Sequence, residues 1–309
     1  MAVENPACSQ PEIVAAIIGC LRDSRWGGQL EVLQTGPPSE TDNIQLIQDN
    51  LQAGDVVLPL GGDGQANNVV NAVWRAQTAG QIDVGDVRAK LCAAGKGNDG
   101  ARSVHGRNTL KPKRIARSLE EPKTAMLDVI QAKTSDGFDK VALSYVAFGF
   151  TGLSAVYINQ PEFRERQRQR GRFVPARALD VAEVFKAARQ RQPFEYQNGS
   201  AETVRAHEIL LALMPRFAAG FVRLDTDPFD RKVVSLELDD RAFPLKAFAV
   251  IGRPWLSGRA NGRPLDIDGQ HELTFLTDTT MQYDGEPHAV AAGTKVSISH
   301  HREAIPVLL

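Results

Sequence analysis

The stretch "LPLGGDGQANNVVNAV" (residues 59–74) places Asp63 between glycines, where an apolar run ends and a helical pattern begins. The preceding "DVVLPL" predicts a short buried strand. The following residues predict a helix that opens near Asn67, because apolar side chains recur on one side of it. Glycine permits a positive φ and a close approach of the backbone to a ligand, as a strand-to-helix phosphate turn requires. The stretch therefore predicts a phosphate-binding turn.

Asp63 is the unexpected residue in such a turn. It would face phosphate oxygens of like charge, which is unfavourable unless a divalent cation lies between them. We therefore expect Asp63 to hold Mg²⁺, directly or through water. The alternative is a tight turn whose aspartate only caps the helix.

A second stretch, "KLCAAGKGNDGARSVHG" (90–106), repeats the pattern of apolar strand, glycine turn and helix. Asn98 or Asp99 is the expected helix cap, and Gly106 the expected end. Two such turns at the carboxyl ends of parallel strands can converge on one ligand.

The arrangement of elements predicts two lobes. The first third of the chain alternates strand-like and helix-like runs, which indicates a parallel sheet flanked by helices. After about residue 130, short β-rich segments separated by Gly, Asp or Pro favour an antiparallel sandwich. We expect an α/β nucleotide-binding lobe at 1–132, an all-β, acceptor-binding sandwich lobe at 133–292, and a C-terminal segment, 293–309, that returns to the first lobe.

Composition excludes several classes of function. The net charge of −1 gives no argument for a nucleic-acid partner, and no apolar run approaches the ~20 residues of a membrane span. The N-terminus lacks the features of a secretion signal. Three cysteines are too few for a disulfide framework or a zinc site. The six histidines show no metal-ligand spacing, and the pair His300–His301 is expected to be exposed. A cytoplasmic protein is expected.

The two glycine turns resemble the diacylglycerol kinase catalytic family, which includes bacterial lipid kinases and sphingosine kinases and is related to the NAD kinases. Four further stretches resemble family motifs and follow in the family's order: "ENPACS" (4–9), "AMLDVIQA" (125–132), "SYVAFGFTGLSAV" (144–156) and "YDGEP" (283–287). The resemblance implies that ATP lies between the lobes, with Mg²⁺ and with its phosphates against the glycine turns.

The same resemblance implies a set of site residues. Asp284 would take the proton from the acceptor hydroxyl, and Asp63 would serve catalysis through the metal. The implied nucleotide contacts are Asn5, Gly61, Gly62, Asp63, Gly64, Gln65, Gly95, Lys96, Gly97, Asn98, Asp99 and Glu286. For "YDGE" the alternative is a plain hairpin turn, since Asp-Gly is also the strongest short hairpin signal.

The chain departs from the family pattern at Gln65 and Lys96, which replace two threonines expected near the nucleotide. Three interpretations follow: a working lipid kinase, a kinase-fold protein that binds nucleotide or lipid without catalysis, and an NAD kinase relative. We favour the first, with the acceptor left open among diacylglycerol, phosphatidylglycerol, a sphingoid base and a non-lipid alcohol.

Two expectations concern partners. The arginine-rich stretch 163–177 is either a solvated segment or a contact with anionic lipid headgroups, which would place the protein peripherally at a membrane. Edge strands in either lobe could pair with a second copy, so a homodimer is a further expectation.

Overall fold

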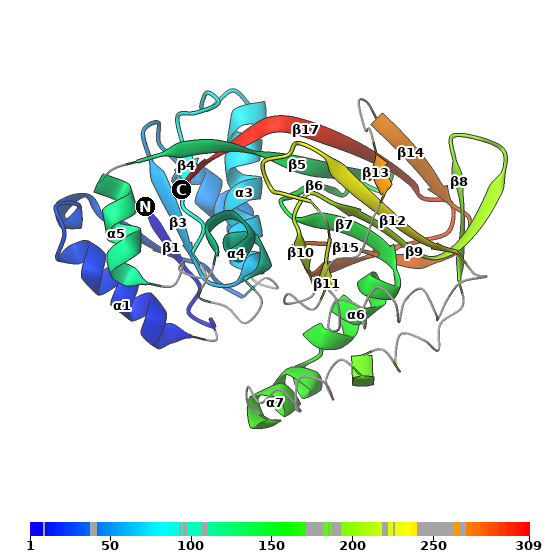
Figure 1. Ribbon diagram of the computed structural model, residues 1–309, viewed down its shortest axis with the longest axis horizontal. Coiled ribbons are helices and arrows are strands. Elements are labelled where there is room, and N and C mark those ends of the chain that lie inside the picture. The colour runs from blue at the N-terminus through cyan, green and yellow to red at the C-terminus, as the bar shows by residue number, and fades with distance from the viewer. Residues whose placement is uncertain are drawn as a thin grey trace.

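The computed structural model describes residues 1–8, 10–37, 42–92, 94, 98–106, 111–120, 122–170, 182–184, 186, 193–217, 222–224, 226–239, 263–265 and 270–309. Figure 1 shows two lobes side by side, with the helices of the first lobe around a small parallel sheet and the strands of the second lobe around their own core. The predicted fold class is confirmed: parallel strands with helices come first, and a largely antiparallel β region follows.

The first lobe is built on four parallel strands in the order β2-β1-β3-β4. Helices α2 and α3 pack on one face of these strands, whereas α1 and α5 pack on the other. The strands are β1 (Ala2–Glu4), β2 (Val32–Gln34), β3 (Val56–Leu60) and β4 (Arg88–Ala89). The helices are α1 (Pro11–Arg22), α2 (Asn43–Asp49), α3 (Asp63–Thr78), α4 (Asp99–His105) and α5 (Pro112–Glu120), with a short 3₁₀ turn at Gly27–Gln29.

The second lobe is antiparallel, with the path β16-β15-β7-β9-β8-β14-β17. Its strands are β5 (Thr124–Thr134), β6 (Asp139–Ala142), β7 (Tyr145–Gly149), β8 (Phe194–Asn198), β9 (Thr203–Ala212), β10 (Arg216–Phe217), β11 (Val222–Arg223), β12 (Val233–Asp239), β13 (Arg263–Leu265), β14 (Gln270–Phe275), β15 (Thr279–Tyr283), β16 (Glu286–Val290) and β17 (Lys295–Leu308). The rings of Phe148, Phe194, Tyr196 and Phe275 pack together in its core.

Two helices, α6 (Phe150–Asn159) and α7 (Pro161–Arg170), interrupt the second lobe, where the sequence predicted a strand motif at 144–156 and either a solvated segment or a lipid contact at 163–177. The strand ends at Gly149, whose φ is +98°. Glu208 on the neighbouring β9 accepts a hydrogen bond from the backbone N–H of Thr151 (2.9 Å) and so satisfies the first turn of α6. Within the described residues, no helix is both long and apolar enough to cross a membrane.

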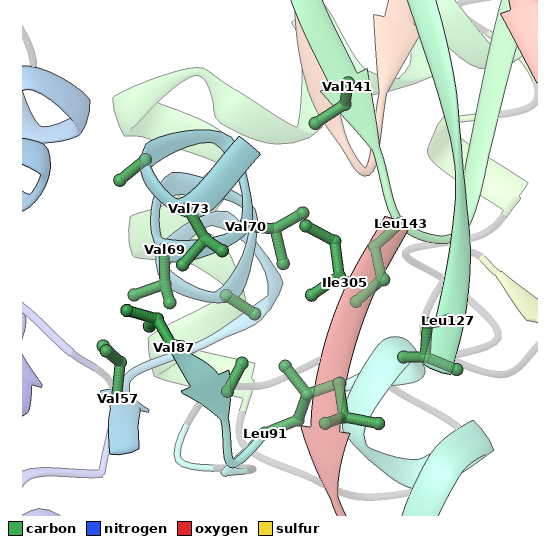
Figure 2. Packing of buried hydrophobic residues seen from close by; sticks show 14 of the residues in the cluster. Val57, Val69, Val70, Val73, Val87, Leu91, Leu127, Val141, Leu143 and Ile305 are labelled. Atoms are coloured by element: carbon green, nitrogen blue, oxygen red, sulfur yellow. The ribbon is translucent and has the colours of Figure 1, made fainter. Parts of the chain in front are cut away.

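Strands β5 and β17 join the lobes. They pair antiparallel along most of their length, and β17 reaches the first lobe, where Val307 pairs in parallel with Ala89 of β4 (Figure 1). The boundary expected at residue 132 therefore falls inside β5. Figure 2 shows the consequence: valines of α3 pack in one cluster with Leu127, Val141 and Ile305, which come from β5, β6 and β17.

One prediction about this junction is wrong. His300 was expected to be exposed, but its side chain is only 3% exposed, and its Nε2 lies 2.8 Å from Oδ2 of Asp128 on β5. The amide of Glu303 donates to the other carboxylate oxygen of Asp128 (2.8 Å). Burial would raise the pKa of Asp128, but these hydrogen bonds outweigh it, so its pKa is lowered.

Candidate active site

The glycine turn after β3 is tight. Helix α3 begins at Asp63, four residues before the expected opening near Asn67. Gly62 has a φ of −90°, which other residues also adopt, whereas at Gly61 the glycine supplies room. A Cβ atom added at Gly61 would lie 2.7 Å from the Cβ of Gln65, closer than side chains ever pack.

Asp63 caps a helix, but not its own. The backbone N–H groups of Asp99 and Gly100 donate to its two carboxylate oxygens, at 3.1 and 3.2 Å. Asp63 at the start of α3 therefore occupies the N-terminus of α4, where unpaired N–H groups and the helix dipole favour a negative charge. The two predicted turns meet through this carboxylate.

The second turn is described only in part. Gly95, Lys96 and Gly97 lie outside the described residues, so their contacts with nucleotide stay predictions. Asn98 is buried and left-handed (φ +56°), and Asp99 begins α4. The helix ends at His105, and Gly106 follows with a φ of +71°, as the sequence predicted.

The stretch "YDGE" forms a hairpin turn between β15 and β16. Asp284 and Gly285 both have positive φ (+47° and +93°), the pattern of a two-residue type I′ turn. The hairpin interpretation does not exclude a role in the site, because the Asp284 side chain is buried at the junction of the lobes.

Four N–H groups hold the Asp284 carboxylate. The amides of Ser144 and Tyr145 donate to Oδ1 (2.8 and 3.1 Å), and that of Leu143 donates to Oδ2 (2.7 Å). The fourth donor is Nδ2 of Asn67, 2.9 Å from Oδ2. Three successive amides of the turn between β6 and β7 thus form an anion-binding nest, and the protein fills it with its own carboxylate.

A third carboxylate completes the group. A Cβ atom added at Gly64 would lie 2.8 Å from Oε1 of Glu286, so the hairpin brings Glu286 against the first turn of α3. Asp63, Asp284 and Glu286 therefore gather at the end of the parallel strands where α3 begins.

The electrostatics of this group favour a cation. Burial raises the pKa of Asp63, and the neighbouring Asp284 raises it further, although the amides of α4 oppose both effects. Burial also raises the pKa of Asp284, against the four hydrogen bonds it accepts. A bound cation would relieve this cost and keep both groups ionised.

The donor set suits Mg²⁺. In the part of the chain that the structure describes, no cluster of three or more His, Cys, Asp or Glu side chains could enclose a metal ion. Mg²⁺ typically binds one or two carboxylates and completes its shell with water and substrate phosphates. A magnesium ion expected at Asp63 would therefore take its other ligands from water and from nucleotide phosphates.

Two other predicted nucleotide contacts lie close by. Asn5 follows β1 beside Gly61, and its Oδ1 accepts a hydrogen bond from the amide of Ala7 (2.9 Å). Gln65 turns inward: its Nε2 donates to the carbonyl of Val3 (3.3 Å), and its Oε1 accepts from the hydroxyl of Thr35 (3.4 Å). The backbone N–H of Gln65 is also engaged, because it donates to the carbonyl of Gly62 (3.1 Å).

Asn67 and Asn71 are buried at this junction and were not among the predicted site residues. A signal was present: both lie on the apolar side of α3, four residues apart, and polar side chains on a buried helix face need hydrogen-bonding partners.

Solved structures share this two-lobed fold. Two structures of a candidate diacylglycerol kinase from Bacillus anthracis str. Sterne are 14% and 13% identical to the chain, with TM-scores of 0.63 and 0.64. The alignments cover 99% of this chain and 95% and 96% of those chains. An NAD kinase from Archaeoglobus fulgidus in complex with ATP is 11% identical, with a TM-score of 0.53, and the alignment covers 100% and 92% of the two chains. No curated protein matches the sequence.

The fold thus places the chain among two-lobed proteins with a parallel α/β lobe followed by an antiparallel β lobe. The family model "Diacylglycerol kinase catalytic domain" matches residues 9–132. Most of the first lobe therefore matches the diacylglycerol kinase catalytic domain family, the family that the sequence motifs resemble.

Proposed function

We propose that the protein is an ATP-dependent lipid kinase that transfers the γ-phosphoryl group of ATP to a lipid hydroxyl. The observation that supports this most directly is the convergence of Asp63, Asp284 and Glu286 on the start of α3, where α4 also begins. The family of the first lobe supports the same reaction class.

Each residue has a defined task in this proposal. The N–H groups at the start of α3 bind phosphate oxygens, and Asp63 holds Mg²⁺, which supplies charge neutralisation during transfer. Asp284 accepts the proton of the acceptor hydroxyl. Its raised pKa, caused by burial, makes it a stronger base than an exposed aspartate.

A second candidate function is nucleotide binding without transfer. It is favoured by Gln65, whose amide is engaged inside the first lobe, and by the four donors already bound to Asp284. Under this alternative the carboxylates serve the structure and the binding of ATP only.

The acceptor reaches the site from a membrane surface in this proposal. Helix α7 carries the described part of the arginine-rich stretch and projects with α6 from the second lobe (Figure 1). Residues 171–177 lie outside the described residues. Basic residues beside an anionic leaflet contribute about 1 kcal/mol each, enough to recruit a protein of near-zero net charge peripherally from the cytoplasmic side.

The experiment is a transfer assay with γ-labelled ATP, Mg²⁺ and vesicles that contain diacylglycerol, phosphatidylglycerol or a sphingoid base. We expect one of the lipids to become labelled. Asp63→Asn should lower the transfer rate by a factor of about 100 or more, which is the loss typical of removing one electrostatic contact to a transition state. Asp23→Asn, an exposed aspartate after α1, is the matched control and should keep the rate.

Calorimetry with ATP and Mg²⁺ separates the two candidates. Nucleotide binding without label in any lipid supports the second candidate. If neither binding nor label is found, both are wrong.

A further inference from the structure

Asn67 and Asn71 are almost completely buried on α3, with exposed fractions of 3% and 1%. A buried side-chain amide is costly unless its donors and acceptor are satisfied. Apart from the hydrogen bonds that these two asparagines make with each other, their partners lie in the other lobe.

Asn71 is bound to the backbone of β6. Its Oδ1 accepts a hydrogen bond from the amide of Val141 (2.9 Å), and its Nδ2 donates to the carbonyl of the same residue (2.8 Å). The side chain of Asn71 therefore pairs with one edge of β6 as a neighbouring strand would. It joins a helix of the first lobe to a strand of the second.

Asn67 extends this connection by one helical turn. Its Oδ1 accepts from Nδ2 of Asn71 (2.9 Å), and its own Nδ2 donates to Oδ2 of Asp284 (2.9 Å) and to the carbonyl of Val141 (3.1 Å). Because the Asp284 carboxylate is also held by the turn between β6 and β7, the network runs without a break from α3 to the hairpin β15–β16.

We propose that Asn67 and Asn71 form an inter-lobe latch: they are positioning residues that fix Asp63, one turn earlier on α3, relative to the Asp284 carboxylate of the second lobe. The latch itself needs no kinase activity. Its catalytic consequence rests on the proposed function.

The latch has two physical effects. Helix α3 is a rigid element, so fixing it at Asn67 and Asn71 also fixes Asp63 against the hairpin. In addition, the hydrogen bond from Asn67 stabilises the ionised form of Asp284 and opposes the effect of burial on its pKa. Removing the amide should therefore raise the pKa of Asp284 further.

The first test is a double-mutant cycle of Asn67→Ala and Asp284→Ala, read out as the folded-to-unfolded ratio in urea. We expect each single variant to lower this ratio at least tenfold. The double variant should lower it by clearly less than the product of the two effects, because both remove the same hydrogen bond. Asn68→Ala is the matched control: Asn68 is the adjacent, half-buried residue on α3 and lies outside this network, so the ratio should change little. The latch would be overturned if the effects of the two substitutions on the ratio simply multiplied, or if Asn67→Ala lowered the ratio no more than Asn68→Ala does.

The second test separates positioning from mere stability. A ¹³C NMR titration of labelled aspartate carboxyls, assigned with Asp284→Asn, reports the pKa of Asp284 directly. We expect Asn67→Ala to raise the pKa of Asp284, and the acidic limb of the pH–rate profile to move upward with it. If the double-mutant cycle shows coupling but Asn67→Ala leaves the titration of the Asp284 resonance unchanged, the positioning role is overturned. A wild-type protein that transfers no phosphate contradicts the proposed function, yet both tests still decide the latch.

Discussion

At the scale of single residues, Glu208 shows how one buried carboxylate can control a helix. It is 2% exposed on β9 and accepts hydrogen bonds from the backbone N–H of Thr151 and from the hydroxyl of the same residue. Burial raises its pKa from 4.5 to about 8, against the effect of these hydrogen bonds. The folded protein therefore keeps a proton on Glu208 over a pH range in which the unfolded chain has lost it.

This difference predicts the pH dependence of stability. The folded-state pKa lies above the unfolded-state value, so the free energy of unfolding should fall as pH rises from about 4.5 to about 8. The slope attributable to one group is at most about 1.4 kcal/mol per pH unit.

Glu208→Gln keeps the shape of the side chain and cannot ionise. It should flatten the dependence of the unfolding free energy on pH in this window, as urea unfolding at pH 5, 6.5 and 8 would show. Glu202→Gln, on an exposed turn, should leave the slope unchanged. Curves of equal slope for wild type and Glu208→Gln would contradict the prediction.

At the scale of elements, helix α6 supports the hairpin that carries Asp284. A Cβ atom added at Gly152 would lie 2.2 Å from the carbonyl oxygen of Thr280 on β15, so helix and strand touch backbone to backbone. Nδ2 of Asn159, at the other end of α6, donates to the carbonyl of Gly285 in the turn itself (3.3 Å). The placement of the hairpin therefore depends on close packing of this helix.

Gly152→Ala should push α6 away from β15. We expect the free energy of unfolding to fall by about 1–3 kcal/mol, because a backbone carbonyl cannot move aside as a side chain does. Gly19→Ala is the matched control: this glycine is also helical, but an added Cβ would meet no atom within 4 Å. Alanine there should raise stability by up to about 1 kcal/mol. Urea unfolding of both variants checks the opposite signs, and a Gly152→Ala protein as stable as wild type would refute the packing argument.

Local signals predicted the elements well and their partners poorly. The strand, glycine turn and helix at 59–74, the end of α4 at Gly106 and the hairpin at Asp284 each follow from residues adjacent in the chain. Helix α6 was missed because "FGFTGLSAV" is apolar on all sides and shows no period, and because Glu208, which satisfies its first turn, lies 57 residues away. The capping of α4 by Asp63 spans 36 residues and is equally invisible to a local pattern.

At the scale of the whole molecule, the two lobes share a core. Ile305 of β17 lies beside the valines of α3, and Leu127 of β5 belongs to the same cluster (Figure 2), while the same two strands also form part of the second lobe. Neither lobe can therefore lose its packing without exposing apolar surface of the other.

We accordingly expect the lobes to unfold together. Hydrogen exchange measured by mass spectrometry should give similar opening free energies for amides of β3 in the first lobe and β7 in the second. Ile305→Ala, at a fully buried position, should lower both by about 2–5 kcal/mol. A second lobe that stays protected while β3 exchanges more easily would show that the lobes are separate folding units.

The turn at position 284 has a consequence for protein engineering. The backbone there tolerates few side chains besides glycine, asparagine and aspartate, because of its left-handed conformation. The surrounding donors, in turn, require a short anion. Aspartate alone meets both demands: asparagine would direct an NH₂ group at an amide, and glutamate is one methylene too long for the space. Redesign of this junction should therefore change other residues of the second lobe and leave Asp284 as it is.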